Sequence, residues 1–252
     1  MVTADPYGNF AAGKEMVRWG SMWGPMPAGS KNADGGVNQW EYLNMAAWIR
    51  ANPAVAMPFF CGKPSGASHV GDMGFMPAPE TYKALLDTKR AFAAHWGPSQ
   101  GFGGPPPTAA FPIRRDQAVP AFTHCSLDDM VGEGDQWGGA AGGTIGSGDP
   151  WGRFNGWMRW SFEDIVDEPG KVAFTVWLDA GAPAESCTAE LTPRKYQKFA
   201  AKPGASFDWT SADEAGTVLE KGPAKADEHG LVTIDKLTVT KAKRRVTIAA
   251  PK

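Results

Sequence analysis

The sequence predicts an α+β chain in two parts: an α/β part in residues 1–120 and an antiparallel β-sandwich in residues 151–252, joined by an acidic, Gly-rich linker at 121–150. Three observations support this prediction. Apolar residues before position 97 follow helical spacing on either side of one short buried run. Beyond position 150 the apolar period changes to two, with turn residues between the short runs. Between these parts, Gly and Pro dominate stretches that fit no regular element.

The first part alternates helical and extended patterns. A helix begins near Asn38, which can cap it together with Glu41 three residues later, and it ends before Pro53 because the residue before a proline leaves helical geometry. Residues 54–61 form an apolar run typical of a buried strand. After a Gly/Ser/Pro-rich loop, residues 80–96 carry apolar side chains at helical spacing. This order of elements predicts an α/β layer.

The second part shows the two-residue period of half-buried strands. In residues 171–178, alternate side chains from Val172 to Leu178 point to one face, whereas Ala173, Thr175 and Trp177 point to the other. Similar runs occur at 154–162, 187–191, 206–210, 231–234 and 245–249. Their spacing predicts roughly seven strands in a sandwich of the immunoglobulin or fibronectin III type.

The composition excludes several classes of protein. The 25 Lys+Arg and 27 Asp+Glu give a net charge of -2, so there is no global basic field that would hold nucleic acid. We find no apolar run long enough to span a membrane, and the opening residues lack a signal-peptide pattern.

Four residues in or beside the Gly/Pro-rich loops are candidate catalytic groups. Ser99 lies in Gly97-Pro-Ser-Gln-Gly101, a literal G-x-S-x-G, the pattern that exposes a nucleophilic serine at a strand-to-helix turn. Here a helical pattern precedes it, and such a pattern also arises by chance in a Gly-rich chain. The candidate bases are His95, at the end of the second expected helix, and His69, for which Asp72 is a candidate acid. For His95 the alternative is the usual interaction of a histidine in a last helical turn with free carbonyls. Ordinary loop polarity explains His69 and Asp72 equally well.

Closely spaced carboxylates separated by glycine predict a calcium site in the linker. The candidate ligands are Asp128, Asp129, Glu133, Asp135 and Asp149. Calcium takes six to eight oxygens and tolerates irregular geometry, but the spacing is not that of an EF-hand. A solvated acidic linker is the alternative. The sequence offers no motif for zinc or for a nucleotide.

Two residue types leave alternatives open. Cys125 and Cys187 could form a disulfide, which would place the protein in an oxidising compartment, or Cys61 and these two could all be buried thiols. The 11 tryptophans suggest stacking on sugar rings, but large aromatics also dominate ordinary cores.

Two sets of residues resemble known proteins. The first set is Pro58-Phe-Phe-Cys-Gly-Lys63, Gly71-Asp-Met-Gly-Phe75, Tyr82-Lys-Ala-Leu-Leu-Asp-Thr-Lys89 and His95-Trp-Gly97. It resembles the C-terminal third of α/β-hydrolases of the prolyl-oligopeptidase or esterase type. The second set is Pro120–Asp129, Asp164–Gly170 and Cys187–Arg194. It is similar to a C-terminal β-sandwich extension of bacterial secreted hydrolase-like proteins, which implies an extracytoplasmic protein.

The chain departs from the hydrolase pattern at the catalytic positions. Pro64-Ser65 stands where the resemblance implies the triad acid, and Pro98–Gly101 stands where it implies the histidine. The upstream half, which would carry the nucleophile elbow, is absent. The resemblance therefore implies the C-terminal part of a larger hydrolase, or a relative without the standard triad.

These observations support three functional hypotheses. The first is a hydrolase of a carboxylic ester or lactone, supported by calcium, in which Ser99, or a water activated by His95 or His69, attacks the carbonyl. The second is a non-catalytic accessory module that binds carbohydrate or another surface. The third is a structural half whose sheet is completed by a partner chain or a second copy.

Overall fold

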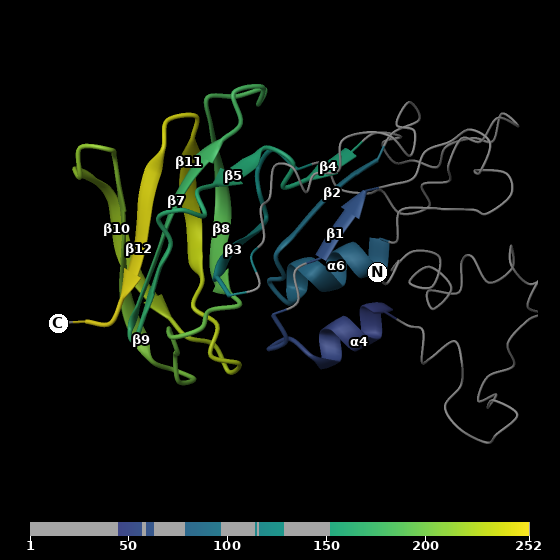
Figure 1. Ribbon diagram of the computed structural model, residues 1–252. Coiled ribbons are helices and arrows are strands. Elements are labelled where there is room, and N and C mark those ends of the chain that lie inside the picture. Colours follow the sequence, from purple (N-terminus) through teal and green to yellow (C-terminus); the bar gives the residue numbers. More distant parts are fainter. Residues whose placement is uncertain are drawn as a thin grey trace, which may run out of the picture.

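The computed structural model shows a β-sandwich beside a smaller part that contains two helices (Figure 1). It describes residues 45–56, 59–62, 79–96, 114, 116–128 and 152–251. Most strands in these residues pair antiparallel. The predicted sandwich is therefore confirmed as an architecture of mainly antiparallel sheets.

The sandwich contains a six-stranded and a three-stranded sheet. The order of the larger sheet is β10 (Val218–Lys225), β9 (Ser206–Ala212), β12 (Arg244–Ala249), β7 (Lys171–Leu178) and β5 (Met158–Trp160), and β6 (Val166–Glu168) also pairs with β7. The order of the smaller sheet is β11 (Ile234–Thr240), β8 (Ser186–Arg194) and β3 (Val119–Thr123).

The burial of its side chains confirms the core face expected in β7, but Ala173, expected on the other face, is buried as well. Phe174 and Val176 are fully buried in the core between the two sheets, where they join Leu191 of β8. Thr175 and Trp177 are half-exposed on the outer face of the six-stranded sheet. The outer face is therefore partly open to solvent at Thr175 and Trp177.

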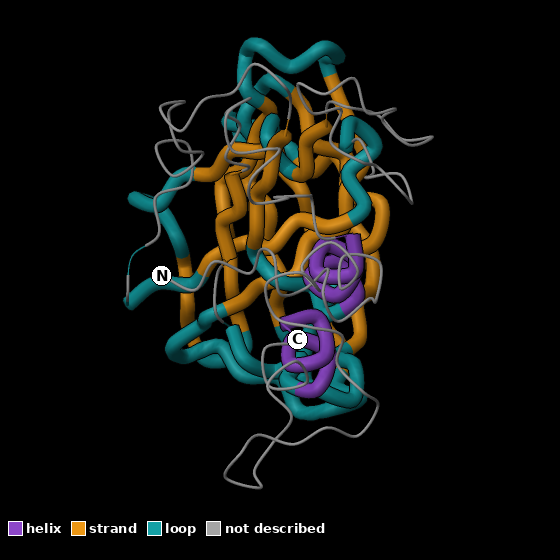
Figure 2. Tube along the Cα trace, turned by 90° about the vertical axis from the view of Figure 1, so that its right-hand side faces the viewer, coloured by secondary structure: helices purple, strands orange, loops and turns teal. Residues whose placement is uncertain are grey.

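The smaller part combines two helices with a short sheet. Its elements are α4 (Met45–Ala51), β1 (Phe59–Gly62), α6 (Pro79–Asp87), β2 (Phe92–Trp96) and β4 (Gly152–Phe154). Strands β1 and β2 pair in parallel, and β4 pairs with β2 in the opposite direction. In Figure 1 the two helices lie below β1 and β2, and in Figure 2 they lie in front of the strands. The described residues form no larger layer of the α/β-hydrolase type, and none of their helices is long and apolar enough to cross a membrane.

The predicted second helix is wrong beyond Asp87. Lys89 adopts a left-handed φ of 52°, and the amides of Lys89 and Arg90 donate to the carbonyls of Leu86 and Leu85, both at 2.9 Å. These two bonds form a Schellman motif, which closes a helix. Phe92 therefore begins a strand, although its spacing from Leu85 fits a helical face.

Two strands pair across the boundary that the sequence predicts. Strand β3 precedes residue 150 but lies on the sandwich, and β4 follows residue 150 but completes the sheet of the smaller part. In the β3–β8 ladder, Pro120 stands opposite Pro193. Two opposed prolines fit a non-hydrogen-bonded pair, because there the N–H groups would face away from the partner strand.

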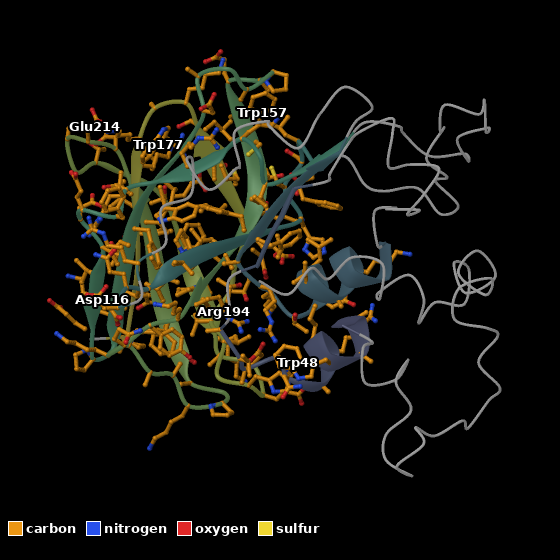
Figure 3. The ribbon with its side chains drawn as sticks, turned by 45° about the vertical axis from the view of Figure 1, so that its right-hand side comes forward. Trp48, Asp116, Trp157, Trp177, Arg194 and Glu214 are labelled. Carbon is orange, nitrogen blue, oxygen red and sulfur yellow. The ribbon has the colours of Figure 1, made fainter. Side chains whose placement is uncertain are left out.

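Arg194 of β8 joins the two parts through hydrogen bonds to backbone carbonyls. Its Nη1 donates to Thr88 O at 2.7 Å and Lys89 O at 3.2 Å, and its Nη2 donates to Pro53 O at 2.6 Å and Val55 O at 3.0 Å. These carbonyls follow the C-termini of α6 and α4, where the helix dipoles favour a cation. Figure 3 shows Arg194 between the sandwich and the helices.

The guanidinium of Arg194 is fully buried, and this burial, together with the charge of Arg90, lowers its pKa to about 10. It therefore remains charged at neutral pH. Arg90, also buried, donates to Asn52 O at 2.5 Å and lies over the ring of Trp48. The joint between the parts therefore holds two buried cations, beside an apolar cluster of Ala91 with Val119 and Ala121 of β3.

Candidate functional site

The candidate catalytic residues flank the two parallel strands in the sequence. His69 and Asp72 follow β1, and Ser99 follows β2; these three lie outside the described residues. His95 is part of β2, where its Cα pairs with Gly62 on one side. The prediction that His95 ends a helix is therefore wrong.

The expected calcium ligands are not gathered by the described part of the chain. Asp128 is described, and its Oδ1 accepts a hydrogen bond from Asn155 N at 2.7 Å. Asp129, Glu133, Asp135 and Asp149 lie outside the described residues. Within the described ranges, no group of three or more acidic, His or Cys side chains could hold a metal ion.

Asp128 lies beside Asn155, which joins the two parts of the molecule. Asn155 has a left-handed φ of 54°, and its buried Nδ2 donates to Phe92 O at 3.0 Å and Phe122 O at 2.9 Å. It thereby connects β2 of the smaller part to β3 of the sandwich. The carboxylate of Asp128 fixes the backbone at this junction, which is a structural role.

His124, one of the four histidines from which a catalytic base could come, has an acid partner. Nδ1 of His124 lies 3.0 Å from Glu190 Oε2, which also accepts a hydrogen bond from Thr123 Oγ1 at 2.7 Å. A carboxylate on Nδ1 is the arrangement that orients the imidazole in catalytic triads. The His124 side chain is 60% exposed, so the pair also fits an ordinary surface contact.

Cys125 and Cys187, for which the sequence left a disulfide open, lie side by side. Their Sγ atoms are 3.7 Å apart, and both thiols are buried and free. The hydrogen bond to Cys187, together with burial, raises the pKa of Cys125. The same hydrogen bond lowers the pKa of Cys187, although burial opposes that change.

An open pocket of about 500 Å³ lies on the outer face of the six-stranded sheet. Three adjacent strands form its floor, since Arg245 of β12 pairs with Thr175 of β7 on one side and with Ala212 of β9 on the other. Its charged lining residues are Asp164, Asp213, Glu214, Lys243 and Arg245.

The polar groups on the floor of the pocket hold one another in place. Asp164 Oδ2 accepts from Thr175 Oγ1 and lies 3.1 Å from Arg245 Nη1, which also donates to Thr175 Oγ1 at 3.2 Å. These three side chains form a closed triangle of donors and acceptors. Groups that are already ordered lose little side-chain entropy when a ligand binds.

The β9–β10 turn forms one wall of the pocket. Asp213 closes this turn because its Oδ1 accepts from Thr217 N at 2.8 Å, and Gly216 adopts a φ of 84° that favours glycine. Glu214 is exposed at the tip of the turn (Figure 3).

Trp177 adds an aromatic surface beside the pocket. Lys243, which lines the pocket, places its Nζ 5.1 Å from the centre of the Trp177 ring. By contrast, Trp157 and Trp209 pack partly buried against the core, and Trp160 is fully buried. The alternation in 171–178 placed Thr175 and Trp177 on this outer face, but nothing in the sequence indicated that Asp164 and Asp213 would meet them.

The comparisons with known proteins assign no function to these features. No protein-family model matches the chain, and neither the curated proteins nor the solved structures contain a significant match.

Proposed function

We propose that the protein is a non-catalytic binding module whose six-stranded sheet binds carbohydrate in the pocket around Asp164, Thr175 and Arg245. The observation that supports this proposal is the hydrogen-bonded triangle of these three side chains on an open sheet face. A sugar hydroxyl both donates and accepts a hydrogen bond, so a surface that presents both kinds of group at fixed positions suits it.

The charge of the pocket favours a neutral ligand. Three carboxylates and two cationic side chains line it, which gives a local balance of -1. A polyanion would be repelled by the carboxylates, and a simple cation would be repelled by Lys243 and Arg245. Trp177 supplies an apolar ring beside these polar groups, a combination that suits the apolar faces and polar edges of a pyranose.

Titration of tryptophan fluorescence tests this proposal. The ligands are soluble oligosaccharides of β-1,4-glucan, xylan and chitin, added separately to the purified chain. We expect saturable binding of at least one of them, and we expect the double variant D164N/E214Q to bind it about tenfold more weakly, the equivalent of about 1.4 kcal/mol. E228Q is a matched control, because Glu228 is exposed and does not line the pocket.

Two outcomes would contradict the proposal. One is that none of the three oligosaccharide series binds to the wild-type chain. The other is that the double variant binds the sugar as tightly as the wild type and the control E228Q do.

We propose, as a second function, hydrolysis of a carboxylic ester or lactone. The observation that favours it is the parallel pairing of β1 and β2, because ligands of open α/β sheets bind outside the carboxyl ends of such strands. The sequence continues from these ends toward His69 and Asp72 and toward Ser99. His124, with Glu190 on its Nδ1, is a further candidate base.

Hydrolysis of p-nitrophenyl acetate and of a γ-lactone tests this second proposal. We expect S99A and H124A to abolish turnover and H229A to leave it unchanged, since His229 contacts only the neighbouring Glu228 among the ion pairs of the described residues. No turnover by the wild type would exclude the activity for these substrates.

The calcium proposal predicts a melting temperature that rises with calcium and falls with a chelator, because a ligand that binds only the folded state stabilises it.

A further inference from the structure

The ladder between β3 and β8 brings two cysteines together. Thr123 pairs with Glu190 in this ladder, and the pairing continues beyond β3, where Ser126 N donates to Thr188 O at 2.8 Å and Thr188 N donates to Ser126 Oγ at 3.1 Å. Cys125 and Cys187 are therefore held by backbone and side-chain hydrogen bonds on both chain segments. The third cysteine, Cys61, lies in β1 of the other part.

The two sulfur atoms are close enough to bond after a small movement. Their separation is 3.7 Å, and a disulfide bond measures about 2.05 Å, so the sulfurs need to approach by less than 2 Å. Rotation about the Cα–Cβ bonds can supply such a movement without breaking the ladder. Both side chains are 5% exposed, but Ser126 and His124, which flank Cys125, are exposed, so local opening at the end of β3 gives an oxidant access.

We propose that Cys125 and Cys187 form an intramolecular disulfide when the protein meets a small disulfide oxidant such as oxidised glutathione. The thiolate of Cys187 attacks one sulfur of the oxidant and releases one glutathione thiolate, which takes up a proton. The thiolate of Cys125 then attacks Sγ of Cys187 in the mixed disulfide and releases the second glutathione. The two cysteines lose two protons and two electrons, and one oxidised glutathione becomes two reduced glutathione molecules.

The order of attack follows from the hydrogen bond between the thiols. Because Cys125 donates to Cys187, the pKa of Cys187 is lowered and its thiolate is the more available nucleophile. The resulting bond closes a ring in which the two residues are 62 positions apart. A link over such a distance restricts the unfolded chain and therefore stabilises the fold. This inference depends on the β3–β8 ladder and not on the proposed ligand pocket.

Peptide mapping of the wild-type chain provides the direct test. The protein is incubated with oxidised glutathione, blocked with iodoacetamide and digested with trypsin without reduction. We expect one linked species that joins residues 116–153 to residues 172–194 and weighs two hydrogen atoms less than the sum of the two peptides. Two unlinked, blocked peptides, or a link that involves Cys61, would overturn the proposal.

Melting temperatures give a second readout that does not depend on the digestion. We expect the oxidised wild type and oxidised C61S to melt roughly 5–15 °C above their reduced forms. C187S should show no such difference between oxidised and reduced samples. If the difference persists in C187S or is missing from the wild type, the stabilising role is wrong, and the peptide map still decides whether the bond forms.

Discussion

The two parts of the molecule are stabilised differently. The sandwich has a continuous apolar core between its sheets, built from residues such as Phe174, Leu191 and Ile248. The smaller part has a separate, smaller cluster around Leu85 and Phe92, between its helices and its short sheet. Hydrogen bonds from buried Arg194 and Asn155 to backbone carbonyls connect the two parts, together with small apolar contacts of Ala91 and Ala93.

This difference indicates that the smaller part depends on the sandwich, whereas the sandwich can hold its own core. Apolar burial is non-directional and tolerates small movements, but hydrogen bonds to fixed carbonyls require the helix ends at one position. Damage to the sandwich should therefore unfold both parts, whereas damage to the smaller part should stay local.

Truncation of one core residue in each part should have the largest effect and tests this direction. We expect F174A to lower the free energy of unfolding by about 3–5 kcal/mol and L85A to lower that of the smaller part by about 2–4 kcal/mol, through lost burial and a residual cavity. Hydrogen exchange measured by mass spectrometry should show faster exchange in both parts for F174A, but only in α4, α6 and β2 for L85A. If L85A also accelerates exchange in β7 and β12, the two parts form one cooperative unit.

Removal of the cation at the joint should have the next largest effect. We expect R194M to cost about 2–4 kcal/mol, because charge-assisted hydrogen bonds are lost and buried carbonyls are left without their donor. R194K should recover only part of this loss, since an ammonium group lacks the planar fork that reaches both helix ends. The exposed ion pair of Arg50 with Asp87 offers a control, and R50M should cost less than about 1 kcal/mol in urea unfolding. An equal loss in R194M and R50M would show that the joint contributes little.

A pH-dependent contact at the same joint should have the smallest effect. Asp227 lies 3.4 Å from Lys89 Nζ, and its Oδ1 accepts from His229 N and Leu231 N at 2.9 Å. Burial alone would raise the pKa of Asp227, but these backbone donors and Lys89 hold it below its usual value. The carboxylate therefore contributes stability above the unfolded pKa of about 3.9, and this contribution is lost as the pH falls through the lower folded pKa.

Urea unfolding of D227N across the pH range checks this expectation. The variant should be less stable than the wild type by about 1 kcal/mol near pH 7. The difference should shrink below pH 4, and K89M should weaken its pH dependence. A difference that stays constant down to pH 3 would mean that hydrogen-bond geometry, and not charge, accounts for the effect.

Local patterns predicted the sandwich better than the smaller part. Strand β7 was predictable because its core face carries a large apolar residue at every second position from Val172 to Leu178, although Ala173 on the other face is also buried. Strand β10 was not, since Gly222 and Pro223 interrupt its sequence and few of its side chains are buried. Strand β3 could not be predicted because it contains Pro120, and whether a proline disrupts a strand depends on the residue opposite it. Strand β2 could not be predicted because Phe92 lies seven residues after Leu85, a spacing that also fits a helix.

The candidate sites show the same limit. The pairing of Cys125 with Cys187 could be proposed from the sequence because few cysteines are available. The pocket could not, because Arg245 reaches Thr175 only when β12 pairs with β7, and Ala212 of β9 joins the lining only because β9 pairs with the other edge of β12. The order of strands in a sheet is a non-local property, and no local period encodes it.

The late position of Arg194 has a consequence for synthesis on the ribosome. The chain that forms α4, α6 and β2 is complete at Trp96, but Arg194 follows 98 residues later (194 − 96). At typical rates of translation this interval lasts roughly 5–20 s. Throughout it, the helix ends lack their buried cation and the short sheet lacks β4 for much of the time. Helices α4 and α6 are therefore synthesised first and stay hydrated and accessible to chaperones until Arg194 has been synthesised.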